Sequence, residues 1–279
     1  MKKYTTTETL LYVDKLSVGY KDKNGKTKLI LKDVTIIEKD IVREGHAATG
    51  QTIAFLGRSG RGKSTLFKAL TGLLAPTSGQ VLITDFSTDD KSDAKPVSEG
   101  DIGFVDQKYT VFRHKTVYQI CQYALRKSTL SKPEKEALIT EYLTDWGLLE
   151  HKAKYGSELS GGQRQRTAII EQMLTSKHFM ILDEPFSGLD VGNIEKVKES
   201  FGRILSDDEY NTIIFSTHDI RLAVELADSI YIIGREVETD EHSTVVKHYD
   251  LKEMGLAWEP YGDGHRKVVG EITEILLKS

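Results

Sequence analysis

The residue pattern that suggests chemistry most clearly is a glycine-rich stretch followed by a lysine and two hydroxyl residues. It fits the spacing G-x-x-x-x-G-K-[ST] and reads Gly57-Arg58-Ser59-Gly60-Arg61-Gly62-Lys63-Ser64-Thr65. Glycines let backbone N–H groups turn inward around phosphate oxygens, and the N-terminal end of a following helix attracts anions. Lys63 can reach the β- and γ-phosphates, and Ser64 can coordinate Mg²⁺. The pattern therefore predicts a phosphate-binding loop.

A pair of acids forms the second candidate site, at the end of the apolar run Met180-Ile181-Leu182. Ligands of open α/β sheets bind at the carboxyl ends of the strands, which is where these acids would lie. Asp183 is then placed to contact Mg²⁺, and Glu184 to orient and deprotonate an attacking water. An Asp-Glu pair after a strand is also compatible with a solvated turn, but the loop at 57–65 favours the catalytic interpretation.

A serine and two glycines at a predicted helix start form a third element, in the sequence Leu159-Ser160-Gly161-Gly162-Gln163. A hydroxyl group and free N–H groups at such a position can bind an anion. A helix capped by Ser160 after a tight turn is the structural alternative. It explains the serine and the glycines, but not their occurrence beside the other two motifs.

Composition restricts the compartment and the partners. The 279 residues carry 38 Lys and Arg against 42 Asp and Glu, and no basic arm dominates, so nucleic acid is not an expected partner. The one cysteine, Cys121, cannot form an internal disulfide and is expected to pack as a small apolar side chain in a reducing cytoplasm. No apolar run approaches the ~20 residues of a membrane span, and no apolar segment follows Met1-Lys2-Lys3. The chain is expected to be soluble by itself.

The elements that must position these residues alternate between strand and helix. Strands are expected at 10–20, 29–37, 52–56, 81–86, 102–105, 179–182, 212–216 and 230–233. Helices are expected at 65–70, 161–175, 193–205 and 220–227, and residues 116–149 have helical spacing throughout. Asn24-Gly25 marks a hairpin turn, 38–50 and 87–100 are expected to be loops, and 235–279 is a tail of mixed character. The apolar strands between helices indicate a parallel sheet covered on both faces.

The order and spacing of the three motifs resemble the nucleotide-binding subunit of an ABC transporter, over about residues 10–234. Leu159–Gln163 is the most specific part of this resemblance. It implies an α/β fold with a P-loop NTPase core of mostly parallel sheet, an antiparallel β subdomain and an inserted α-helical subdomain. The expected division is core at 1–107, helical subdomain at 108–157, core at 158–234 and a short extension at 235–279.

The resemblance also implies roles for further residues. Tyr20 lies where the family has an aromatic residue that stacks on adenine. Gln107 matches the glutamine that contacts Mg²⁺ or the attacking water, and Asp190 belongs to Ser187-Gly188-Leu189-Asp190, which matches the D-loop. His218 matches the switch histidine that touches the γ-phosphate. The remaining histidines show no ligand spacing and are expected in loops or on the surface: His46, His151, His178, His242 and His265.

In the resembled family, ATP and Mg²⁺ bind between two subunits that pair head to tail, so that residues 159–163 of one chain would cover the phosphate loop of the other. A homodimer is the expected form. Transmembrane permease subunits on separate chains, and possibly a substrate-binding protein, are the further partners. The chain would then lie on the cytoplasmic face of the inner membrane, and a permease helix would dock between the core and the helical subdomain.

Several functions stay open within this resemblance. The pattern around Phe112 and Thr217-His218-Asp219 is similar to importer subunits for small anions such as nitrate or sulfonates. Exporter or lipid-transport subunits, and soluble ATPases of assembly or repair, are alternatives. A regulator that does not hydrolyse ATP is disfavoured by intact Lys63, Asp183 and Glu184. Arg113 in place of a common proline, and Glu171 after the signature helix start, depart from the family pattern without touching a catalytic position.

Overall fold

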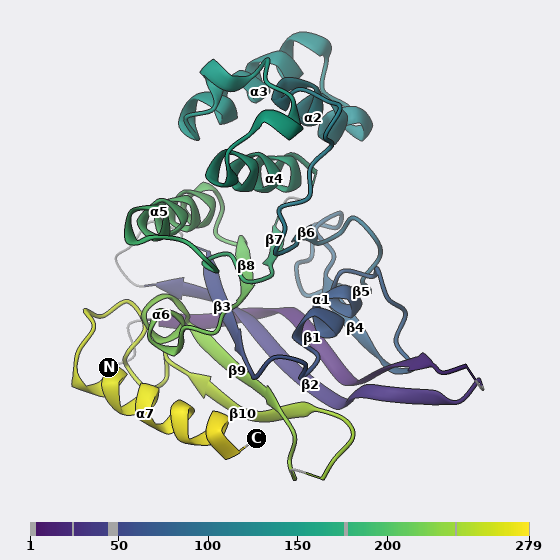
Figure 1. The fold of residues 1–279 in the computed structure, drawn as a ribbon, viewed down its shortest axis with the longest axis vertical. Coiled ribbons are helices and arrows are strands. Elements are labelled where there is room, and N and C mark those ends of the chain that lie inside the picture. Colours follow the sequence, from purple (N-terminus) through teal and green to yellow (C-terminus); the bar gives the residue numbers. More distant parts are fainter. Residues whose placement is uncertain (1–3, 24, 44–49, 176–177, 238, 279) are drawn as a thin grey trace.

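The computed structural model describes residues 4–23, 25–43, 50–175, 178–237 and 239–278. A helical lobe lies at one end of the molecule, two sheets lie in the middle, and the C-terminal helix lies at the opposite end (Figure 1). None of the helices in the described ranges combines the length and the hydropathy that a membrane span requires.

The main sheet has six strands in the order β10-β9-β3-β8-β7-β6. Five of them run parallel, and β10 is antiparallel to β9. Their bounds are β3 (Gln51–Leu56), β6 (Gly103–Val105), β7 (Phe179–Leu182), β8 (Thr212–Ser216), β9 (Ser229–Gly234) and β10 (Thr244–Asp250). The strands β3, β7, β8 and β9 are buried along their whole length, as near-continuous apolar strands of a covered parallel sheet should be. The predicted fold class is confirmed.

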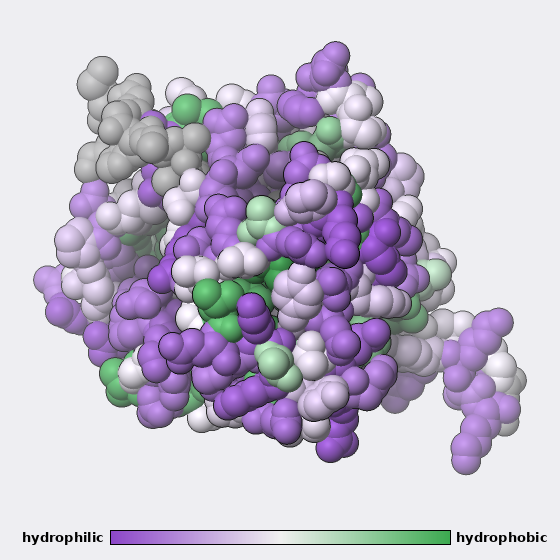
Figure 2. Space-filling model, turned by 90° about the horizontal axis from the view of Figure 1, so that it is seen from above, coloured by the Kyte–Doolittle hydropathy of each residue, from purple (hydrophilic) through white to green (hydrophobic). Residues whose placement is uncertain are grey.

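The second sheet is antiparallel, in the order β2-β1-β4-β5. It consists of β1 (Tyr4–Lys21), β2 (Thr27–Arg43), β4 (Ser78–Thr84) and β5 (Ala94–Pro96). The β1–β2 hairpin stands away from the body, and its tip is hydrophilic (Figures 1 and 2). Gly25 has a φ of 80° beside this turn, while Asn24 of the predicted turn lies outside the described residues.

The helices of the core are α1 (Lys63–Leu70), α4 (Gly161–Thr175), α5 (Val191–Asp207), α6 (Ile220–Leu226) and α7 (Asp263–Lys278). The lobe contains α2 (Val117–Ala124), α3 (Lys132–Asp145) and 3₁₀ turns at Leu125–Lys127, Leu149–His151 and Gly156–Glu158. Helix α3 begins at a capping box, in which Glu134 accepts a hydrogen bond from the backbone N of Ser131 at 2.7 Å. Cys121 is fully buried, which confirms its packing role. The predicted subdomain boundaries stay a prediction.

Two apolar clusters hold these layers together. One lies where the antiparallel sheet, the main sheet and α1 meet, and there the ring centroids of Phe55 on β3 and Phe67 on α1 are 5.6 Å apart. The other joins the opposite face of the main sheet to the helical lobe and to α7. Both ends of the loop between β3 and α1 are therefore anchored in one core, which positions the predicted phosphate loop.

The prediction of a loop over 38–50 was wrong for residues 38–43, which continue β2 and pair with β1 from Tyr4 onward. The alternation of β2 places Glu38 and Asp40 on the same buried face as Val34 and Ile36. Charged residues suggested solvent exposure, whereas partners far along the chain allow these two to be buried. Residues 44–49, including His46, lie outside the described residues.

The tail and one predicted loop are also more ordered than expected. Residues 235–279 contribute β10 to the main sheet and α7 to the layer beside α6, and β5 lies within the predicted loop 87–100. His265 of α7 is buried rather than exposed. Its Nδ1 accepts a hydrogen bond from Gly262 N at 3.1 Å, and its Nε2 lies 3.0 Å from Leu256 O, so its role is to join the turn before α7 to the helix.

Candidate functional site

A cavity of about 430 Å³ opens where β3, β7 and β8 end above α1. Most of the predicted site residues line it, from five separate parts of the chain. They are Tyr20, Arg58, Ser59, Gly60, Arg61, Gly62, Lys63, Ser64, Thr65, Gln107, Asp183, Glu184 and His218, with Ile30 as a further neighbour. The structure thus brings together the phosphate loop, the acid pair and the residues predicted from the family resemblance.

Two glycines explain why the loop takes this path. Gly62, just before α1, has a φ of 94°, a conformation that favours glycine. A Cβ on Gly57 would lie 2.4 Å from the carbonyl oxygen of Ile233, so only glycine allows β9 to approach this closely. The Lys63 ammonium is buried and donates a hydrogen bond to Gly57 O at 2.6 Å. Burial lowers the pKa of Lys63, while Glu184 and Asp183 oppose this effect.

The acid pair is held by hydroxyl groups. Ser64 Oγ donates to Asp183 Oδ2 at 2.7 Å, and Ser216 Oγ donates to Asp183 Oδ1 at 2.6 Å. The same Ser216 Oγ accepts a hydrogen bond from Glu184 N at 2.8 Å. Ser216 is fully buried and fixes both acids, a role that the sequence motifs do not indicate. The available signal was a hydroxyl residue at the end of the strand that precedes His218.

Glu184 has an unusual backbone and an unusual environment. Its φ is 53°, which for a non-glycine residue costs on the order of 1 kcal/mol. Its side chain is largely buried, and Oε1 lies 3.0 Å from His218 Nε2, although not in hydrogen-bond geometry. Burial raises the pKa of Glu184, and electrostatic interactions with His218 and Lys63 partly offset this. The site therefore holds a carboxyl group with raised proton affinity beside the phosphate loop.

The donor atoms near Asp183 fit a magnesium ion. Ser64, Asp183 and Gln107 offer hydroxyl, carboxylate and amide oxygens, and Mg²⁺ binds through one or two carboxylates together with substrate phosphates. The described residues contain no group of three or more His, Cys, Asp or Glu side chains able to hold a metal. A Mg²⁺ ion at Asp183 would complete its coordination with phosphate oxygens and water.

The third motif lies elsewhere. Ser160 and Gln163 cap the start of α4 reciprocally: Ser160 N donates to Gln163 Oε1 at 3.1 Å, and Gln163 N donates to Ser160 Oγ at 3.3 Å. Ser160 and Gly161 are exposed, and the predicted residues Ser160, Gly161, Gly162, Gln163 and Asp190 do not line the cavity. Asp190 caps α5 by accepting a hydrogen bond from Asn193 N at 2.9 Å. The predicted residues of one chain thus fall into two separate groups.

Residues 44–187 match the family model described as ABC transporter. A sulfate/thiosulfate import ATP-binding protein of Thermosynechococcus vestitus is 36% identical over 203 residues, which cover 73% of this chain and 59% of that protein. The protein of the same name from Synechococcus elongatus is 37% identical over 186 residues, covering 67% of this chain and 53% of that protein. A third, from Pectobacterium atrosepticum, is 33% identical over 238 residues, covering 82% and 69%.

Two solved structures share the fold. CbiO1 from Clostridium perfringens, described as part of the ABC transporter complex cbiONQ, has a TM-score of 0.68 and 27% identity over 97% of this chain and 98% of that one. An ATP-binding subunit of an ABC transporter has a TM-score of 0.68 and 23% identity, over 95% of this chain and all of that one. The chain spans between about half and two thirds of the length of the curated relatives it matches. It belongs to the ABC transporter family, among the ATP-binding subunits.

Proposed function

We propose that this chain binds and hydrolyses ATP as a subunit of an ABC importer for a small solute. The relatives named above import sulfate or thiosulfate, which supports a small anion as the cargo. The membrane-spanning parts and any substrate-binding protein would be separate chains, and this subunit would lie on the cytoplasmic face of the membrane. ATP and Mg²⁺ are the proposed ligands of the cavity.

This proposal rests on the separation of the predicted site residues into a group that lines the cavity and a group that lies outside it. The cavity contains the phosphate loop, Asp183 and Glu184, whereas residues 159–163 lie outside it, with Ser160 and Gly161 exposed at the surface. A second copy placed head to tail would bring its own 159–163 over the open cavity and complete it. Because each site would then use residues from both chains, closure of the dimer and ATP binding would stabilise one another.

The principal polar groups of the cavity have distinct roles in this proposal. The backbone of the loop and Lys63 would bind the phosphates, and Tyr20, which is 45% exposed at the cavity edge, would stack on the base. Ser64, Asp183 and Gln107 would hold Mg²⁺, which when bound neutralises charge on the phosphate oxygens.

Glu184 would accept the proton of the attacking water, and its raised proton affinity suits that role. His218, 3.0 Å from Glu184 Oε1, would contact the γ-phosphate and keep the carboxylate oriented. Ser216 would hold the backbone of Glu184 and the carboxylate of Asp183 in fixed relation.

The membrane partner would dock in a second, larger hollow. A groove of about 980 Å³ lies between the core and the helical lobe, with β6 and the turn after α1 on one side and α3 and the turn after α2 on the other. Leu73 and Leu130, which are 51% and 38% exposed, line it. We propose that a helix of a permease subunit occupies this groove. The groove lies between the core and the helical lobe, so a helix bound there would contact both parts when the dimer closes on ATP.

The alternatives of export, lipid transport, or a soluble role in assembly or repair have less support. The relatives named above are import proteins, and no observation on the described residues points to nucleic acid or to a lipid. Co-expression with candidate permease subunits, followed by capture from detergent extracts, would test the transport role. Failure of every such permease to bind would favour a soluble ATPase.

Nucleotide binding is tested by Lys63→Ala. Loss of this ammonium should weaken ATP affinity about a hundredfold, because charge-assisted hydrogen bonds to phosphate are lost. Lys68→Ala, on an exposed position of α1, is the matched control and should bind ATP as the unmodified chain does. Titration with a fluorescent ATP analogue measures both. An unchanged affinity in Lys63→Ala would contradict the role of the loop.

A further inference from the structure

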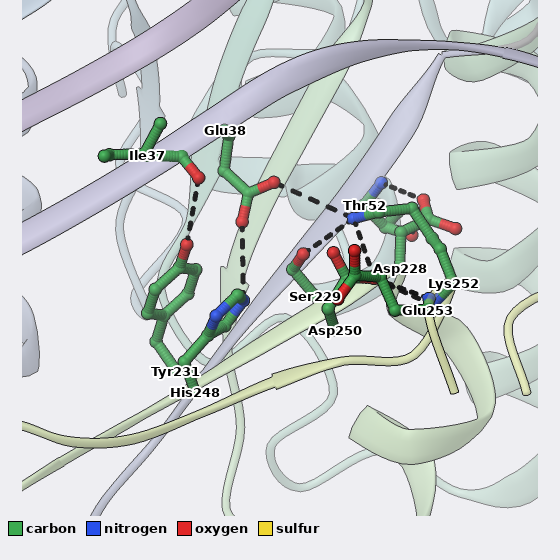
Figure 3. Close-up of polar contacts among 10 residues, drawn as sticks. All are labelled: Ile37, Glu38, Thr52, Asp228, Ser229, Tyr231, His248, Asp250, Lys252 and Glu253. Atoms are coloured by element: carbon green, nitrogen blue, oxygen red, sulfur yellow. Dashed lines mark hydrogen bonds and ion pairs between the residues drawn. The ribbon is translucent and has the colours of Figure 1, made fainter. Parts of the chain in front are cut away.

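A buried cluster of charged residues lies where the C-terminal extension meets β2, β3 and β9 (Figure 3). Its centre is Lys252, which follows β10 and is 7% exposed. Lys252 Nζ donates a hydrogen bond to Ser229 Oγ at 2.8 Å, and lies 3.9 Å from Glu38 Oε2 and 3.6 Å from Asp250 Oδ1. Lys252 therefore connects the C-terminal extension to β2 through Glu38 and to β9 through Ser229.

A second acid joins this cluster to β3. Asp228, which is 3% exposed, accepts hydrogen bonds from Thr52 N at 2.7 Å and from Thr52 Oγ1 at 3.2 Å (Figure 3). Its backbone carbonyl accepts a hydrogen bond from Leu251 N at 3.0 Å. Burial raises the pKa of both Glu38 and Asp228, and the charge of Lys252 opposes this in each. The positive charge of the Lys252 ammonium therefore offsets part of the cost of burying the two carboxylates.

The cluster lies where β3 and β9 begin, and the phosphate loop lies where they end. The two strands run parallel, with Ile53 opposite Ser229 and Leu56 opposite Ile232. One residue further on, Ile233 O packs so closely on Gly57 that a Cβ there would lie 2.4 Å away. A slip of β9 along β3 would therefore move a carbonyl against the first residue of the phosphate loop.

We propose that Lys252 is a positioning residue for nucleotide binding. By fixing Ser229 and supporting Asp228, it sets the register of β9 on β3, and β9 in turn sets the position of Gly57. Gly57 O accepts the hydrogen bond of Lys63, so the register also determines where that ammonium points before phosphate arrives. This inference rests on the proposed function and adds the C-terminal extension to the parts on which ATP binding depends.

The test compares ATP affinity and turnover in Lys252→Met and in the double variant Glu38→Gln/Lys252→Met. The double variant neutralises the Glu38 carboxylate together with the Lys252 ammonium, so it leaves fewer uncompensated buried charges than the single variant. We expect the KM for ATP to rise about tenfold while kcat changes less than about twofold, because the loop is displaced and the acid pair is not. Lys267→Met, exposed on α7 of the same extension, is the control and should leave both values unchanged.

Ser229→Ala tests the proposal even if neither variant of Lys252 folds. It removes the 2.8 Å hydrogen bond, keeps every charge, and should raise the KM about threefold. The proposal is overturned if Ser229→Ala, or a folded lysine variant, binds ATP with the unmodified affinity. If the unmodified chain itself binds no ATP, the proposed function fails instead, so the two failures are distinguishable.

Discussion

At the scale of single residues, serine hydroxyl groups orient the two acids of the site through hydrogen bonds. Ser216 accepts from the backbone of Glu184 and donates to the carboxylate of Asp183, so one buried hydroxyl orients both acids. The left-handed backbone of Glu184 lets its buried side chain lie beside His218. Such strain persists where the surroundings determine the conformation, and it is commonly found at active sites.

Glu184→Gln tests the proposed base directly. The amide keeps the shape of the side chain but cannot accept the proton, so hydrolysis should fall about a thousandfold while ATP binding is retained. With turnover blocked, ATP should hold two copies together, which size-exclusion chromatography with ATP detects. Glu150→Gln, on an exposed turn of the lobe, is the control. Normal hydrolysis in Glu184→Gln would remove this residue as the base.

Glu171 on α4 should make stability depend on pH. Burial raises its pKa to about 7, although the charge of Arg126 opposes this. Between pH 4.5 and about 7, the folded state therefore keeps a proton on Glu171 that the unfolded state has released. The free energy of unfolding should fall as the pH rises through this range. Glu171→Gln should remove that loss and gain on the order of 2 kcal/mol over the unmodified chain at pH 8.

Urea denaturation at pH 5 and at pH 8 measures this difference. The advantage of Glu171→Gln should be small at pH 5 and larger at pH 8. An advantage that is equal at both values would show that the carboxyl group is not destabilised by its burial between α4 and the lobe.

At the scale of elements, the chain uses its C-terminal extension to complete the sheet. Strand β10 pairs with β9 from Thr244 to Asp250, and α7 packs beside α6. Without them the edge of β9 would be unpaired, and Glu38 and Asp228 would lose Lys252. The extension therefore behaves as part of the core in this structure, rather than as an appended module.

Truncation after Gly234 tests that conclusion. Loss of the buried contacts of β10 and α7 should cost more than about 5 kcal/mol, which exceeds or matches the stability of many domains. The truncated chain should therefore be insoluble or unfolded by circular dichroism. A soluble, cooperatively folding truncation product would contradict the structural role of the extension.

At the scale of the whole molecule, the separation of the two groups of site residues predicts a shared site. A chain with Lys63→Ala has a defective phosphate loop, and a chain with Gly161→Asp has a defective 159–163 segment. Each homodimer should be inactive. In a mixed head-to-tail dimer the two defects fall in the same site, which leaves the other site intact.

Mixing the two inactive variants should therefore restore ATPase activity, to about a quarter of the unmodified rate for random pairing and independent sites. The measurement is phosphate release at a fixed total concentration of protein. No recovery, under conditions in which mixed dimers form, would mean that each chain uses its own residues 159–163.

The sequence by itself determined the family and the fold class, because the three motifs depend on local spacing: a loop at 57–65, a helix start at 159–163 and acids at 183–184. These patterns report what a few consecutive backbone groups and side chains can do, so they can be read without the fold. The roles of the individual site residues stay a prediction.

Tertiary structure alone decided which charged residues are buried. Glu38 reads as a loop residue in the sequence, yet it lies in a strand opposite Lys252 of the tail, and Ser216 reads as a strand end, yet it connects both acids. Whether a charge or a hydroxyl can be buried depends on partners that the fold brings from distant parts of the chain. Local spacing carries no information about such partners.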